Sequence, residues 1–354
     1  MDLASLLETW GDTNVLAAAG ALVGFVFGLA AQRSRFCTRA AVIETCQGQL
    51  GDRFAVWWLG FSACLLGVQA LVFAGALQPQ TSRFIAPLGS VSGALIGGLL
   101  FGVGMIMTRG CAGRLLILSA TGNLRALITI VVFALAVQAS ISGWLAPTRL
   151  AVAAWWPIDG GPGRDLLQIT GIGRSGGLAL AALAFVSAAW LCARNLPGRW
   201  ALALGAITAG LCVAAGWGLT QAIASQSFEA VKIQSISFSS ASAEWLMRVL
   251  STGNAPRFSF DAGMLPATFL GAWVGALLGG DFQWQSFQKE HKLGHYLIGA
   301  LLMGLGAVLA VGCTVGAAMA GGAMFALTAW LTLITIWLGA GLAWRAHRAM
   351  GWPV

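Results

Sequence analysis

Two glycine–cysteine pairs interrupt hydrophobic stretches of this chain, and they are the residues with the clearest chemical potential. They are Gly110–Cys111, within RGCAGR, and Gly312–Cys313, within VGCTVG. Glycine ends a helix at low cost, and the residue after it can open another. A helix start exposes free N–H groups and about half a positive charge, which favours anions. We therefore expect each cysteine at the tip of a broken helix that faces a small anion.

A third cysteine, Cys37, follows RSRF at a similar interruption. A thiol is a weak hydrogen-bond donor and a polarisable group, so it can contact a soft sulfur-bearing anion and release it again. Weak sites in series are what passage through a pore requires. The alternative is that the three cysteines are only small residues at tight turns. The buried-looking Cys64, Cys192 and Cys212 lie in apolar runs and are interpreted as packing residues.

Two basic residues follow these cysteines closely. Arg39 and Arg114 come two and three residues after Cys37 and Cys111, so either could attract an anion or simply anchor a cytoplasmic loop. The chain has no CxxC pair, which argues against a zinc site or a thioredoxin-type centre. His291 and His295 are interpreted as surface residues. We expect no metal and no cofactor.

The composition is that of a membrane protein. Of 354 residues, 58% are hydrophobic and only 9% are charged, whereas soluble domains carry about 25% charged residues. The net charge of +8 is explained by arginines that flank membrane spans, so we expect no nucleic-acid partner. The sequence predicts an all-α polytopic protein in a lipid bilayer, with residues 1–354 as a single integral membrane domain.

Hydropathy and length predict about nine transmembrane helices and four short pieces. The spans are 14–31, 54–77, 90–107, 123–146, 177–193, 200–222, 262–280, 295–311 and 323–344. The pieces at 34–46, 111–121, 238–250 and 313–321 are too short or too polar to span, and we interpret them as re-entrant half-helices. Broken backbone at membrane depth needs protein or a water-filled cavity around it, so these pieces point to a pathway.

The distribution of Lys and Arg predicts the orientation. With the N-terminus outside, 13 basic residues fall on the cytoplasmic side and 7 on the outer side. The excess favours a cytoplasmic C-terminus.

An internal repeat has an offset of 202 residues. The block GGLLFGVGMIMTRGC (97–111) aligns with GALLMGLGAVLAVGC (299–313), glycine on glycine and cysteine on cysteine. The same offset places Phe36 on Phe238 and Cys37 on Ser239. The first repeat covers 14–146, the span 177–193 links the halves, and the second repeat covers 200–344. Because an odd number of spans separates the copies, the second is inverted, as in many transporters.

The three cysteine blocks resemble the YeeE/YedE family of sulfur-compound transporters. They are GFVFGLAAQRSRFCTRAAVIE (24–44), GGLLFGVGMIMTRGCAGR (97–114) and GLGAVLAVGCTVG (304–316). The resemblance implies a non-enzymatic protein of the bacterial inner membrane that takes up thiosulfate. It implies that the ion passes from Cys313 to Cys111 to Cys37, and that a separate cytoplasmic partner, TusA-like or rhodanese-like, carries the sulfur.

Two other functions stay open from the residues alone. A membrane sulfurtransferase or thiol-redox protein would use a cysteine as nucleophile, although no histidine lies near the three cysteines in sequence. A transporter of another sulfur or selenium species would share the same motifs. No acidic residue lies clearly in the middle of a span, so the energy source for uptake is not evident from the sequence.

Overall fold

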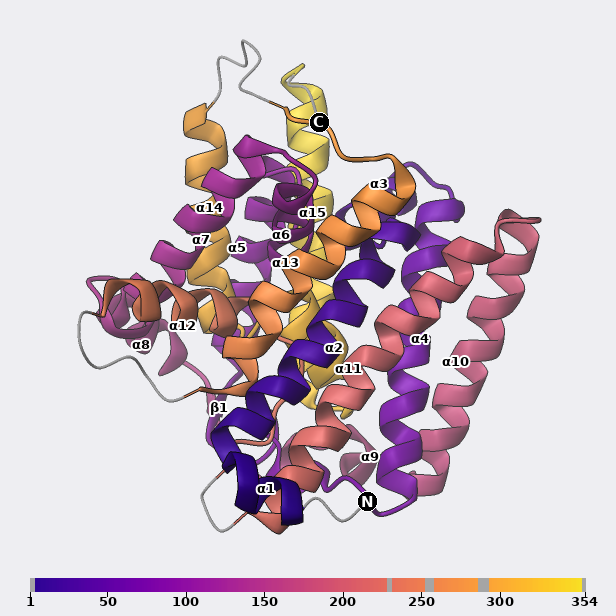
Figure 1. Cartoon of the computed structure of the whole chain (residues 1–354). Coiled ribbons are helices and arrows are strands. Elements are labelled where there is room, and N and C mark those ends of the chain that lie inside the picture. The colour runs from indigo at the N-terminus through magenta and orange to yellow at the C-terminus, as the bar shows by residue number, and fades with distance from the viewer. Residues whose placement is uncertain (1–3, 228–230, 252–257, 286–292, 352–354) are drawn as a thin grey trace.

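The computed structural model describes residues 4–227, 231–251, 258–285 and 293–351, and the chain is almost entirely helical (Figure 1). In this described part, nine helical stretches are long and apolar enough to cross a membrane. The prediction of an all-α protein with nine spans is confirmed. The stretches are Asp12–Cys46, Asp52–Phe73, Val91–Ala120, Leu124–Ser142, Gly173–Asn195, Trp200–Gln226, Phe260–Gly279, Leu293–Gly321 and Leu327–Ala349.

Three of these stretches are not single helices. The first consists of α2 (Asp12–Ser34) and α3 (Thr38–Cys46), the third of α5 (Val91–Met107) and α6 (Ala112–Ala120), and the eighth of α14 (Leu293–Leu309) and η3 (Thr314–Gly321). The helix η3 is a π-helix. Together with α12 (Phe238–Leu250), the short members of these pairs lie where the sequence predicted four short pieces.

The remaining long helices are α4 (Asp52–Phe73), α7 (Leu124–Ser142), α10 (Gly173–Asn195), α11 (Trp200–Gln226), α13 (Phe260–Gly279) and α15 (Leu327–Ala349). The sequence did not predict α1 (Ala4–Trp10), α8 (Ala146–Ala153), α9 (Leu166–Ile169) or the 3₁₀ turns η1 (Pro79–Thr81) and η2 (Pro162–Arg164). Nor did it predict the antiparallel pair β1 (Gly89–Ser90) and β2 (Pro157–Ile158). In Figure 1, α1 lies at the lower end of the molecule and the last turns of α15 at the upper end.

Glycines set the distance between the central helices. The helix α5 packs against both α14 and α15. A Cβ at Gly102 would lie 2.3 Å from the Ile336 carbonyl oxygen of α15, and one at Gly104 would lie 2.4 Å from the Gly299 oxygen of α14. Small residues allow such close backbone approach in a bilayer, where helices gain little from the hydrophobic effect. These glycines therefore have a packing role.

A second glycine stripe joins α2 to α13. Added Cβ atoms at Gly20, Gly24 and Gly28 would lie 2.1–2.3 Å from backbone oxygens of α13. The spacing of four residues puts all three on one face of α2. The helix α2 also packs on α11, which in turn packs on α4. The breaks in α2, α5 and α14 are therefore held in a close-packed centre.

Candidate functional site

The three broken helices end in the same way. The residues Arg35, Arg109 and Val311 adopt left-handed backbone, with φ of 55°, 58° and 60°. In each case the N–H of the next residue donates to a carbonyl five residues earlier: Phe36 to Ala31, Gly110 to Met105 and Gly312 to Ala307. This is the Schellman pattern, in which a left-handed residue ends a helix and satisfies its last carbonyls. In all three cases the residue that follows the donor (Phe36, Gly110 or Gly312) is a cysteine.

The glycines do not take the role that the sequence predicted for them. We expected the helices to end at Gly110 and Gly312, but the left-handed residues that end them lie one position earlier, at Arg109 and Val311. Gly110 is not among the residues with positive φ. A left-handed conformation is rare for a non-glycine residue and is unusual for a β-branched one. Strain of this kind is concentrated at functional sites in proteins.

Each of the three cysteines is the N-cap of the short helix that follows. Cys37 precedes α3, Cys111 precedes α6 and Cys313 precedes η3, all with extended backbone. The Cys313 sulfur accepts a hydrogen bond from the Gly316 N–H at 3.4 Å. The thiols therefore lie at the positive ends of short helices, as the sequence predicted for a helix break.

The structure brings the three cysteines into one cluster. The Cys111 thiol lies close enough to Cys37 and Cys313 for electrostatic interaction, and it faces the Thr314 hydroxyl. The Thr314 oxygen is buried and has no other hydrogen-bond partner. The three helix breaks, between α2 and α3, between α5 and α6 and between α14 and η3, therefore bring their cysteines together.

Solvent exposure differs along the cluster. Cys37 is half-buried, Cys111 is 5% exposed and Cys313 is fully enclosed. The cluster is therefore closer to solvent at the Cys37 side than at the Cys313 side. An ion that reached Cys313 from the opposite side would need some movement of the surrounding segments.

The fourth short helix, α12, starts beside the other tips. Its N-cap is Ser237, whose hydroxyl lies 3.3 Å from that of Ser239. By position at a helix start, Ser237 corresponds to Cys37, so the pairing of Cys37 with Ser239 is displaced by two residues. A Cβ on Gly316 of η3 would lie 2.6 Å from the Ser237 hydroxyl oxygen, and one on Gly113 of α6 would lie 2.8 Å from the Phe238 ring. Both Ser237 and Phe238 thus contact the tips of the other breaks, whereas Phe36 packs on Gly60 of α4.

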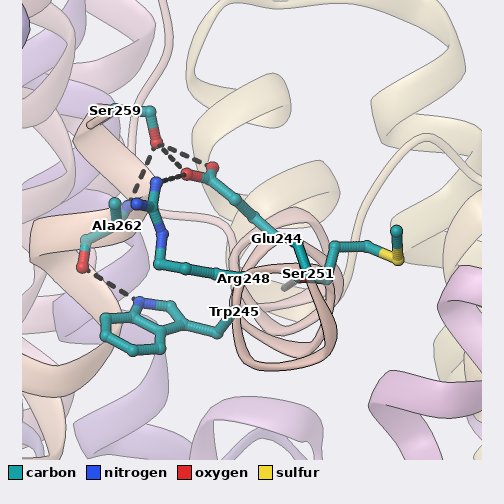
Figure 2. A network of polar contacts seen from close by, with 7 residues as sticks. Glu244, Trp245, Arg248, Ser251, Ser259 and Ala262 are labelled. Carbon is teal, nitrogen blue, oxygen red and sulfur yellow. Dashed lines mark hydrogen bonds and ion pairs between the residues drawn. The ribbon is translucent and has the colours of Figure 1, made fainter. Parts of the chain in front are cut away.

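Polar contacts anchor α12 to the start of α13 (Figure 2). Ser259 accepts from the Ala262 N–H and donates to the Glu244 carboxylate at 2.7 Å. Glu244 also pairs with Arg248 at 3.2 Å, and the Trp245 indole donates to the Ala262 carbonyl at 2.9 Å. The position of α12 relative to α13 is therefore defined by several half-buried hydrogen bonds and an ion pair.

Basic side chains gather near Cys37. Arg39 interacts electrostatically with Cys37, Arg109 and Arg125, and its Nε is buried without a partner. Arg125 donates to the Tyr296 hydroxyl at 2.9 Å and lies over its ring. Arg114 instead turns toward Gln32, with its Nη1 at 3.4 Å from the amide oxygen. Of the two predicted basic residues, Arg39 is the one whose side chain interacts electrostatically with one of the three cysteines.

A charged group near Cys313 was not predicted from the sequence. Arg83, in the loop before β1, interacts electrostatically with Cys313 and with Asp261 of α13. Burial lowers the pKa of the Arg83 guanidinium from its ordinary value, and Asp261 opposes that shift. Asp261 is 3% exposed and is the second residue of the span Phe260–Gly279, so it lies at the end of that span and not in its middle. Arg83 is separated from Cys313 by 230 residues, and no local pattern marks it.

The π-helix η3 and the turn after it are held by side chains of α4 and α11. Gln69 donates to the Ala323 carbonyl at 2.7 Å, and Trp217 donates to the Ala320 carbonyl at 3.3 Å. Helix ends leave carbonyls without partners, and these bonds satisfy two of them away from water. Every residue of η3 is buried.

Within the described ranges, no group of three or more His, Cys, Asp or Glu residues could hold a metal ion. Of the two histidines predicted at the surface, His295 is half-buried and lies next to His347, with ring centroids 4.9 Å apart, and His291 lies outside the described residues. A small cavity lined by Arg35, Arg53 and Arg199 lies at the end of α2 and is a separate feature.

These features define a multi-pass helical membrane protein whose broken helices meet at a cluster of thiols. A model of the sulphur-transport family matches residues 33–342, and the chain belongs to that family, known as YeeE/YedE. The resemblance found in the cysteine blocks is confirmed.

Two relatives match over nearly their whole length. The chain is 26% identical over 347 residues to a thiosulfate transporter, TsuA, of Spirochaeta thermophila, which covers 93% of this chain and 98% of the relative. It is 24% identical over 353 residues to the thiosulfate transporter TsuA of Escherichia coli, with 90% of each chain covered.

Proposed function

We propose that this protein takes up thiosulfate across the bacterial inner membrane along a path formed by Cys313, Cys111 and Cys37. The observation that carries the proposal is the clustering of three thiols at three helix starts. Each start presents backbone N–H groups to an anion, and each thiol offers a soft, weak contact to sulfur. The family and the names of the two relatives support thiosulfate as the ion.

The two-fold repeat is part of this proposal. The helices α5 and α14 have bounds that differ by 202 at both ends. If α2, α4, α5 and α7 correspond to α11, α13, α14 and α15, then the packing of α2 on α13 matches that of α11 on α4. In the same way, α5 on α15 matches α14 on α7. This exchange symmetry supports two halves at 14–146 and 200–344, inverted about an axis in the membrane plane and linked by the span 177–193.

The orientation follows from the same proposal. The N-terminus lies outside and the C-terminus in the cytoplasm, so the ion meets Cys313 first and Cys37 last. The short helices are re-entrant in this arrangement, as a path through the midplane requires. A fluorescent protein fused to the C-terminus tests the sidedness, because it fluoresces only when it folds in the cytoplasm. A dark fusion with normal membrane expression would reverse the proposed direction.

The chain acts without covalent turnover in this proposal. A sulfur carrier of the TusA or rhodanese type that receives sulfur at the Cys37 end stays a prediction. Mass spectrometry of the purified protein after exposure to thiosulfate tests for a persulfide on Cys37. A stable persulfide would favour the sulfurtransferase alternative.

The decisive experiment is uptake of radiolabelled thiosulfate in cells that lack their own importers. We expect Cys111→Ala and Cys313→Ala each to lower the uptake rate at least about tenfold. Cys37→Ala should lower the rate less, because Cys37 is partly exposed to solvent. Cys212→Ala is the matched control, since Cys212 is buried on α11 outside the cluster. Excess sulfate should compete poorly. Background uptake by the unmodified protein would reject thiosulfate, whereas full uptake by all three variants would reject the thiol path.

A further inference from the structure

The guanidinium of Arg83 lies over the Phe84 ring, with its Cζ 4.9 Å from the ring centroid, but among the described residues it has no recorded hydrogen-bond or ion-pair partner. Arg83 is half-buried, and its Nε is completely enclosed. Buried donors are nearly always satisfied in native proteins. An arginine presents a planar fork of donors that matches oxyanions such as sulfonate or phosphate. The open donors of Arg83 therefore suit an anion that is bound only part of the time.

Arg83 lies near one end of the thiol cluster, so an anion bound to it would also be near a thiol. Arg83 interacts electrostatically with Cys313, the most deeply buried of the three cysteines. Lys232, which is exposed, interacts electrostatically with Arg83 and adds a second positive charge. Thiosulfate has three oxygens at one end and a single sulfur at the other. An arginine suits the oxygen end and a thiol suits the sulfur end.

The carboxylate of Asp261 places a negative charge near the Arg83 guanidinium. It is 3% exposed, its Oδ1 has no hydrogen-bond partner, and Ser240 of α12 is hydrogen-bonded to its side chain. The charged groups that face it are Arg83, Lys232 and Glu244. Glu244 is already engaged by Arg248 and Ser259 (Figure 2). Asp261 is therefore the acid left to oppose Arg83.

We propose that Arg83 and Lys232 form a binding site that holds the oxygen end of the anion while Cys313 faces its sulfur, and that Asp261 keeps this binding weak. The inference rests on the proposed function and adds the residues that select the ion. Sulfate lacks the terminal sulfur, so it gains only the arginine contact. The Asp261 carboxylate repels the dianion and attracts Arg83, which favours release of the ion toward Cys111.

The proposal predicts opposite effects for two substitutions. Arg83→Gln should raise the half-saturation concentration for thiosulfate uptake roughly tenfold or more, because it removes a charge-assisted contact. Asp261→Asn should lower it by about three- to tenfold and also lower the maximal rate, because the ion is released more slowly. Arg83→Lys keeps the charge without the fork and should fall between the unmodified protein and Arg83→Gln.

Arg149→Gln is the matched control. Arg149 lies on α8, is half-buried and also has an enclosed Nε without a partner. If Arg149→Gln raises the half-saturation concentration as much as Arg83→Gln does, the effect is general attraction and the proposal fails. It also fails if Arg83→Gln and Arg83→Lys both leave the half-saturation concentration unchanged, or if Asp261→Asn raises it.

A binding measurement separates this proposal from the proposed function. Thiosulfate should raise the unfolding temperature of the purified protein in detergent, and Arg83→Gln should abolish most of that shift while sulfate produces a smaller one. A shift that depends on Arg83, in a protein without measurable uptake, would keep the binding site and reject transport. Cysteine-dependent uptake with no effect of Arg83 on uptake or on the shift would keep transport and reject the site. The absence of both uptake and shift would reject both.

Discussion

The breaks at Cys111 and Cys313 share one backbone design but differ in what surrounds them. Both have a Schellman turn, a glycine and a cysteine N-cap. The first break carries its own cations, Arg109 and Arg114. At the second break, Val311 and Gly316 stand at the aligned positions. The second also continues as a fully buried π-helix instead of the α-helix of the first.

The difference shows that the motif encodes a backbone geometry and not a charge. At the second break the positive charge comes from Arg83 and Lys232, which belong to other segments. A π-helix is rare and is frequently found at functional sites. Three pairs of variants test how far this contrast between the two breaks extends.

The largest contrast is expected at the two glycines. A Cβ on Gly312 would lie 2.6 Å from the Ala317 backbone nitrogen, whereas one on Gly110 would lie 3.4 Å from a flexible Leu115 methyl group. Gly312→Ala should therefore cost about 1–3 kcal/mol and remove most of the uptake, because the Cys313 tip must shift. Gly110→Ala should keep nearly full uptake. Equal uptake by the two variants at matched expression would show that the two turns tolerate a side chain equally.

A smaller effect is expected where the two short helices end. The Ala323 carbonyl that follows η3 depends on the Gln69 side chain, whereas the Thr121 and Gly122 carbonyls that follow α6 accept from the backbone N–H groups of Gln283 and Gln285. Gln69→Met should lower the free energy of unfolding by about 1–3 kcal/mol, because it leaves a buried carbonyl unpaired. The control Gln285→Ala should change it by less than about 0.5 kcal/mol, since that side chain is exposed. Thermal unfolding in detergent measures both, and equal shifts would contradict the contrast.

The smallest effect is expected at the left-handed residues. Val311→Gly should stabilise the protein by about 1 kcal/mol, because glycine adopts the left-handed conformation without strain and Val311 is already 42% exposed. Arg109→Gly gains the same relief but loses the contact of its guanidinium with the Tyr296 ring, 5.9 Å away. It should show little net gain in unfolding temperature. A lower unfolding temperature for Val311→Gly would show that the valine side chain contributes packing that outweighs its strain.

Much of the fold could be predicted because a lipid bilayer allows few backbone structures to span it. Only helices satisfy the backbone in a membrane, so apolar stretches of sufficient length locate the spans. The same reasoning located the four short helices, since those pieces are too short or too polar to span a bilayer. Short elements outside the spans, such as α8 and the β1–β2 pair, were missed because water can satisfy their backbone and no apolar period marks them.

The candidate site was predicted only in part. Cys37, Cys111 and Cys313 were identified because a reactive side chain beside a helix break is a local pattern. Arg83 and Asp261 were missed because their partners are remote in sequence, and Asp261 lies at the boundary of a predicted span. The residue at a helix start that corresponds to Cys37 was placed two positions late, because α11 ends without the tight turn that ends α2.

The amino-acid sequence by itself determined that this is a helical membrane protein with nine spans and three cysteines at broken helices. That information is local, because length, hydropathy and helix-ending residues act over one or two turns. The tertiary structure alone decided that the three thiols meet, that a distant arginine interacts with one of them and with a buried aspartate, and that η3 is a π-helix. Those features depend on which helices pack together, and close packing between segments hundreds of residues apart leaves no signature in any short stretch of the chain.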